Sequence, residues 1–174
     1  TMIGTVIYVF VYTIGLKTTT PQNIVIGGAA GAVPPMVGWV AVTGSLDLAA
    51  WYMFAIIFFW TPPHFWALAL LMKDDYAKAG VPMLPVVASV HETKKQILLY
   101  TLVLVALTCM FFTTKVVGLV YMLGAILLGG VFVFYNTRLL RGEGIDGAKA
   151  SYLYSLLYLA LLFGIIMVDA VLRI

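Results

Sequence analysis

The sequence predicts an all-α fold, a polytopic bundle of transmembrane helices, and three observations lead to it. Apolar residues make up 63% of the 174 residues and charged residues 10%, against roughly 45–50% and 25% in soluble domains. The apolar residues form six stretches near the ~17–25 residues that cross a bilayer. Basic residues collect in alternate connections, as membrane topology requires. We therefore expect a lipid bilayer as the solvent.

A single membrane domain, residues 1–174, accounts for the whole sequence. The chain begins on Thr1 and is apolar at once, which we interpret as a fragment whose N-terminal part is missing. Two spans contain a proline pair, Pro34–Pro35 and Pro62–Pro63, which should kink or interrupt a helix. Gly27 and Gly31 are four residues apart, a spacing that lets helix backbones approach closely. The expected spans are residues 2–16, 24–42, 48–72, 96–112, 116–135 and 152–171.

The connections 17–23, 73–95 and 136–150 fall on one side of the membrane in this arrangement. They contain Lys17, Lys73, Lys78, Lys94, Lys95, Arg138, Arg141 and Lys149, whereas the other side contains Lys115 and Arg173. Positive charge collects on the cytoplasmic side, or on the matrix side in mitochondria. The small basic excess, ten Lys and Arg against seven Asp and Glu, therefore indicates topology and not nucleic-acid binding. The single cysteine, Cys109, excludes a disulfide within the chain.

Residues 60–85, WTPPHFWALALLMKDDYAKAGVPMLP, combine an apolar helix that contains a histidine with a charged loop. His64 lies about 12 Å from the cytoplasmic end of its helix, at ~1.5 Å per residue. An ionisable side chain at that depth is a functional candidate. Helical spacing places Thr61, His64 and Leu68 on one face that leads towards Asp75, so we expect His64 and the loop carboxylates to face one cavity. A histidine bonded to a neighbouring helix is the alternative.

The loop that follows, KDDYAK at residues 73–78, mixes carboxylates with ammonium groups. Carboxylates suit Mg²⁺, which usually keeps waters and substrate phosphates in its shell, and lysines neutralise phosphate charge. Lys17 and Asn23 could meet a phosphate at the same face. The alternatives are a solvated, charge-balanced loop and an ordinary helix-end lysine. Near the chain end Asp169 and Arg173 are spaced to pair, and His91 and Glu92 are expected to cap the fourth span.

Three blocks of sequence resemble the protohaem IX farnesyltransferases, the haem O synthases of the UbiA prenyltransferase superfamily. They are YTxxLK followed by NIVIGGAAGA, then PPxxGW, and then WTPPHFWALAL with DYAKAGVPMLPVV. The resemblance covers essentially the whole chain. It implies nine helices around a lateral cavity that opens to lipid, with two Asp-bearing loops on the cytoplasmic side. The six spans match helices four to nine, so the first Asp-bearing loop of the family is absent from this sequence.

The resemblance assigns site residues one by one. Asp75 and Tyr76 match the Asp–Tyr pair of the second loop, Asp74 stands at a variable position, and His64 matches the histidine of the TPPH motif. Lys17 matches the lysine of a Lys–Arg pair, but Thr18 replaces the arginine. The second carboxylate that the superfamily often carries four residues away is replaced by Leu71 or Ala79. A metal site here would therefore depend more on the first loop.

The implied reaction is farnesyl transfer from farnesyl diphosphate to a vinyl group of haem B, completed by water to give haem O. Asp75 with Asp74 would hold Mg²⁺. The chain alone is expected to be inactive.

Haem A synthase or oxidase assembly proteins are candidate partners, and the bacterial inner membrane, or the mitochondrial one, is the expected location. A related prenyltransferase acting on an aromatic quinone precursor is one alternative, and a membrane transporter or scaffold is another. The implied substrate-binding residues are Lys17, Asn23, Lys73, Tyr76 and Lys78, and the implied catalytic residues are Asp75 and His64, with His64 contacting the porphyrin or orienting water.

Overall fold

The computed structural model describes residues 23–172, so the expected span 2–16, Lys17 and Arg173 lie outside the described residues. Within residues 23–172 every regular element is a helix, and five helices are long and apolar enough to cross a membrane. These five correspond to the second to sixth expected spans, so the all-α membrane fold is confirmed for this part of the chain. The elements are α2 (Asn23–Gly31), α3 (Val33–Thr43), α4 (Leu48–Leu71), α5 (Lys73–Lys78), α6 (Leu84–Val87), α7 (Val90–Met110), η2 (Phe111–Thr114), α8 (Leu119–Arg141) and α9 (Ala148–Leu172).

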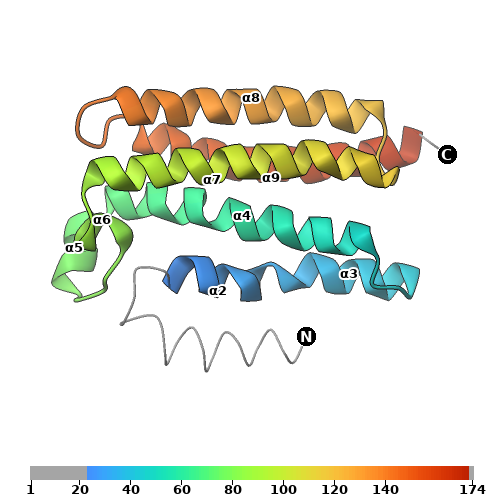
Figure 1. The fold of residues 1–174 in the computed structure, drawn as a ribbon, viewed down its shortest axis with the longest axis horizontal. Coiled ribbons are helices and arrows are strands. Elements are labelled where there is room, and N and C mark those ends of the chain that lie inside the picture. The colour runs from blue at the N-terminus through green and yellow to red at the C-terminus, as the bar shows by residue number, and fades with distance from the viewer. Residues whose placement is uncertain (1–22, 173–174) are drawn as a thin grey trace.

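Among residues 23–172 the long helices lie side by side along one axis, with α2 and α3 at one edge and α8 at the other (Figure 1). Helix α4 is in the middle of the bundle, where it packs against α2 and α3 on one side and against α7 and α9 on the other. The main core lies between α4, α7, α8 and α9 and includes Ile56, Leu104, Phe132 and Tyr158. Because α4 has neighbours on both sides, its residues are the best placed to meet other spans.

Basic residues separate between the two ends of the bundle. Helices α5 and α6 and the α8–α9 connection lie at one end, and the α3–α4 and η2–α8 connections lie at the other (Figure 1). The first end carries the lysines of α5, the lysines near the start of α7 and α9 and the last-turn arginines of α8, and the other end carries Lys115. The charge separation expected from the sequence therefore holds among residues 23–172. The residues at the first end are Lys73, Lys78, Lys94, Lys95, Arg138, Arg141 and Lys149.

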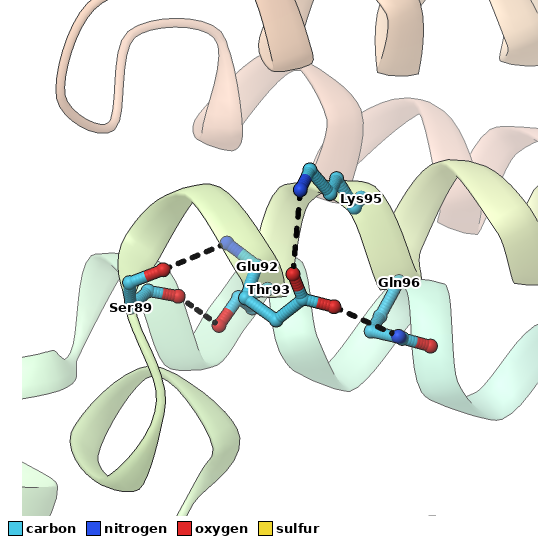
Figure 2. Close-up of polar contacts among 5 residues, drawn as sticks. All are labelled: Ser89, Glu92, Thr93, Lys95 and Gln96. Atoms are coloured by element: carbon cyan, nitrogen blue, oxygen red, sulfur yellow. Dashed lines mark hydrogen bonds and ion pairs between the residues drawn. The ribbon is translucent and has the colours of Figure 1, made fainter.

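Two connections are shorter than the sequence analysis predicts. The segment 73–95 contains α5, α6 and the first six residues of α7, and the segment 136–150 contracts to residues 142–147. Polar side chains extend these helices because they find partners there. Ser89 Oγ accepts a hydrogen bond from the Glu92 N–H at 3.0 Å, and the Glu92 carboxylate contacts Lys95 and Gln96 (Figure 2). Ser89, and not His91 or Glu92 as predicted, is therefore the N-cap of α7, although Glu92 lies in its first turn as expected.

The two proline pairs have different consequences. Between α2 and α3 the regular helix is interrupted at Ala32, and Pro34 and Pro35 occupy the first turn of α3, where a helix does not need their N–H groups. Pro62 and Pro63 lie inside α4, which continues from Leu48 to Leu71 without a break. The expected interruption is thus confirmed for the first pair and wrong for the second.

A close approach between helices occurs in α2, but one residue away from the predicted glycine pair. A Cβ built on Gly28 would lie 3.0 Å from Thr61 Cγ2 of α4, whereas a Cβ on Gly31 would meet nothing within 4 Å. Gly28 is therefore the residue that allows α2 to pack on α4 at Thr61. The helix turns Gly31 away from this contact, so the prediction for Gly31 is wrong.

Helix α8 is capped at both ends by buried charges from its neighbours. The Asp169 carboxylate of α9 accepts hydrogen bonds from the N–H groups of Gly118 and Tyr121, at 2.6 and 3.1 Å. At the other end Lys94 Nζ of α7 donates to the carbonyl of Gly142 at 2.8 Å. The negative group lies at the helix N-terminus and the positive group at its C-terminus, which is the favourable arrangement for the helix dipole. The expected Asp169–Arg173 pair involves a residue outside the described range.

Candidate functional site

The carboxylates and lysines predicted for the phosphate site lie together on the short helix α5. Asp74, Asp75 and Lys78 are exposed, and Lys73 is half-buried. Met72 ends α4 and precedes α5 with φ −110° and ψ 23°, so the chain changes direction between the two helices. The charged side chains therefore extend beyond the end of the bundle, where water and a diphosphate would have access.

Tyr76 attaches α5 to the rest of the molecule. Its half-buried ring packs on a small apolar cluster of Ile24, Ala69 and Met83. Ile24 is the second residue of α2, and Asn23 begins that helix. The predicted site residues Asn23 and Tyr76 therefore belong to neighbouring parts of one end of the bundle, and Lys17 lies outside the described residues.

His64 lies inside the bundle and contacts α9. Its Nδ1 atom is 2.7 Å from Ser155 Oγ, and its ring stacks on those of Trp60 and Tyr152, with centroid distances of 4.4 and 4.8 Å. The Trp60 indole N–H donates to the carbonyl of Ser155 at 2.8 Å. The side chain of His64 is 7% exposed. The imidazole is thus held by one residue of its own helix and two residues of α9.

The structure does not bring His64 and Asp75 together. His64 is buried against α9, whereas Asp75 is exposed on α5. A cavity of about 470 Å³, lined by Phe112, Lys115 and Leu119 among others, lies at the opposite end of the bundle. Among residues 23–172 no three His, Cys, Asp or Glu side chains are close enough to hold a metal ion. The candidate residues thus form two separate groups, a buried histidine and an exposed acidic helix.

Sequence reasoning missed the residues of α9 that hold His64, and it placed Asn136 in a loop. Asn136 is buried within α8, where its amide donates to Thr101 Oγ1 at 2.8 Å and its carbonyl accepts from Ser151 Oγ. Ser151 and Ser155 lie four residues apart in α9, so they share one face of an otherwise apolar helix. This spacing was the available signal that α9 presents hydroxyl groups to its neighbours.

Comparison with known proteins gives the family. The profile of the UbiA prenyltransferase family matches residues 1–162. This chain belongs to the UbiA prenyltransferase family. No solved structure matches the chain.

Several similar proteins carry the name protoheme IX farnesyltransferase. The protein from Roseiflexus sp. (strain RS-1) is 54% identical over 168 residues, which are 97% of this chain and 32% of that protein. The protein from Nitrosospira multiformis is 50% identical over 166 residues, 95% of this chain and 56% of that protein. This chain therefore spans about a third to a half of the length of these relatives, in agreement with the expectation that it matches only part of the family's sequence.

Proposed function

We propose that this chain is part of an intramembrane prenyltransferase that transfers the farnesyl group of farnesyl diphosphate to a vinyl group of haem B, giving haem O. The observation that carries the proposal is the identity of about half of all residues, along more than nine-tenths of the chain, with proteins named protoheme IX farnesyltransferase. An apolar bundle with a charged helix at one end suits a substrate with a long hydrocarbon tail and a diphosphate head.

The residues of α5 are suited to the diphosphate end of the substrate. Asp75, with Asp74, offers the oxygen ligands that Mg²⁺ prefers, and two carboxylates suffice where substrate phosphates and water complete the shell. When bound, the ion would supply positive charge to the leaving diphosphate. Lys73 and Lys78 lie on the same short helix and would neutralise further phosphate charge. Lys17, Asn23 and Tyr76 are further candidates for contacts with the substrate.

The charge distribution supports a location for the proposed reaction. Basic residues collect on the cytoplasmic side of membrane proteins, and α5 lies at the end of the bundle that carries most of them. This distribution supports a position of α5 and the diphosphate at the cytoplasmic face, and the bacterial relatives support a bacterial inner membrane. Haem A synthase or oxidase assembly proteins would receive the product.

The proposal is tested with the full-length protein in membranes that are supplied with farnesyl diphosphate and haem B. The wild type should form haem O, and Asp75→Asn should reduce the rate about a hundredfold, the effect of removing one electrostatic contact to a developing charge. Removal of Mg²⁺ by a chelator should abolish the reaction, and its return should restore activity. Glu143→Gln, which changes an exposed carboxylate in the α8–α9 connection at the same end, is the control and should leave the rate unchanged.

Two results would contradict the proposal. Full activity of Asp75→Asn would remove the metal role from α5. Transfer to 4-hydroxybenzoate, but not to haem B, would instead assign the protein to the quinone-precursor branch of the family.

A further inference from the structure

The hydrogen bonds around Ser155 determine which nitrogen of His64 carries the proton. Ser155 Oγ lies 2.6 Å from the carbonyl oxygen of Tyr152 and 2.7 Å from His64 Nδ1. A carbonyl can only accept, so the single hydroxyl proton of Ser155 points to Tyr152. Towards His64 the hydroxyl oxygen can then only accept. His64 therefore carries its proton on Nδ1 and has an unprotonated Nε2.

The Nε2 atom is thus the remaining acceptor of the ring. Among residues 23–172 no side chain or backbone group donates a hydrogen bond to it. The ring is 7% exposed, which leaves room for a small molecule such as water rather than for the face of a large planar ligand. Its orientation is fixed by Ser155 and by stacking on Trp60 and Tyr152. A neutral imidazole that is held in this way has the properties of a general base.

We infer that His64 Nε2 takes the proton of the water molecule that completes the reaction, and that Ser155 is the positioning residue that keeps Nε2 free. This inference rests on the proposed function. In the first step the farnesyl C1–O bond breaks, the electron pair leaves with the diphosphate, and C1 bonds to the terminal vinyl carbon of haem B. The cation that results lies on the vinyl carbon next to the porphyrin. The water oxygen bonds to that carbon, one water proton passes to His64 Nε2, and it is finally carried by the released pyrophosphate.

The neighbours of His64 fit this role because they offset part of the cost of charging a buried imidazole. The Nδ1–H bond to Ser155 is kept when Nε2 gains a proton, so no rearrangement is needed. The rings of Trp60 and Tyr152 present π faces to the imidazolium, a favourable contact for a cation at a site with little water. Without a base at this position, the protonated alcohol would keep its extra proton and lose water again, and the released pyrophosphate would take a proton from a carbon adjacent to the cation, which gives an alkene that lacks the added water.

The test measures the ratio of hydrated to dehydrated product, by mass spectrometry, for full-length variants that convert farnesyl diphosphate and haem B. Ser155→Ala should lower this ratio about tenfold, the effect of one lost hydrogen bond, and Ser155→Thr, which keeps a hydroxyl, should restore it. His64→Phe should lower the ratio about a hundredfold, the lower end of the contribution of a general base. Ser151→Ala removes an equally buried hydroxyl of α9 that bonds Asn136 and not His64, and should leave the ratio unchanged.

The inference is overturned if Ser155→Ala or His64→Phe gives the wild-type ratio, or if Ser151→Ala lowers it as much as Ser155→Ala. Ser155→Cys keeps the side-chain volume with a weaker acceptor and replaces Ser155→Ala in the comparison if the alanine variant does not fold. A wild-type protein that forms no haem O would instead refute the proposed function. The two failures are therefore distinguishable, since only the wild-type assay decides the second.

Discussion

Pro34–Pro35 begin the second half of a broken helix, whereas Pro62–Pro63 lie inside a helix that continues without a break. The surroundings differ in the same way. None of the residues 33–43 of α3 is buried, while Thr61, Pro62, Pro63 and His64 of α4 are all buried. The prolines of α4 remove the N–H groups that would reach the carbonyls of Phe58 and Phe59.

This difference shows that neighbouring helices decide whether a proline pair breaks a span. Helix α4 is held between α2 on one side and α7 and α9 on the other, so packing keeps it continuous although two backbone donors are missing. Helix α3 has no buried residue within the described part of the chain, so there is less packing there to oppose the local preference of the prolines, and the helix is interrupted. The two missing backbone hydrogen bonds lie directly before His64. Helix α4 therefore holds this side chain in a fixed position although its own hydrogen bonding is weakened there.

The largest effect is expected from a change in the contact between α2 and α4, which lies beside the buried pair Pro62–Pro63. Gly28→Val would force a side chain against Thr61, because a Cβ added at Gly28 would lie only 3.0 Å from Thr61 Cγ2. Such overpacking costs about 1–3 kcal/mol. Thermal unfolding of the full-length protein in detergent should show a clearly lower Tm. Gly31→Val makes the same change where nothing lies within 4 Å, and an equal loss of Tm in this variant would contradict the assigned contact.

A smaller effect of opposite sign is expected when one proline of each pair becomes alanine. Pro63→Ala returns an N–H group to the interior of α4, a gain of about 3 kcal/mol, against a loss of about 1.6 kcal/mol for two buried methylene groups. A net increase in Tm should follow. Pro35→Ala should change Tm little, because an N–H group in the first turn of α3 has no carbonyl partner within that helix. A larger gain for Pro35→Ala than for Pro63→Ala would reverse the comparison.

The smallest effect concerns the hydroxyl group that precedes the buried pair. Thr61 Oγ1 donates to the carbonyl of Ile57 at 2.8 Å, a back-bond that tends to bend a helix. Thr61→Val keeps the shape of the side chain and removes this bond, at a cost of about 0.5–1.5 kcal/mol. Thr113→Val removes a similar bond, to Met110, at an exposed position, and should cost less in the same unfolding measurement. Equal costs would show that burial beside Pro62 has no influence.

The fold class and the approximate positions of the spans could be predicted because each depends on local apolar content. The helix ends could not, since they depend on partners such as Ser89 for α7 and Asp169 for α8. The same limit applies to the site. The sequence identified His64 by its depth in an apolar span, but Ser155 is separated from it by 91 residues. The predicted shared face of His64 and Asp75 assumed one continuous helix, and the turn at Met72 ends that helix before Asp75.

The charges that cap α8 have a consequence for how the chain is assembled in the bilayer. The ribosome delivers Lys94 before α8 and Asp169 after it, so the N-terminal N–H groups of α8 have no carboxylate until the following helix arrives. Because uncapped backbone groups are costly near lipid, we expect α8 to reach its final position only after α9 has been inserted. Translation that stops after residue 141 should therefore leave a loosely anchored hairpin that quality-control proteases can reach.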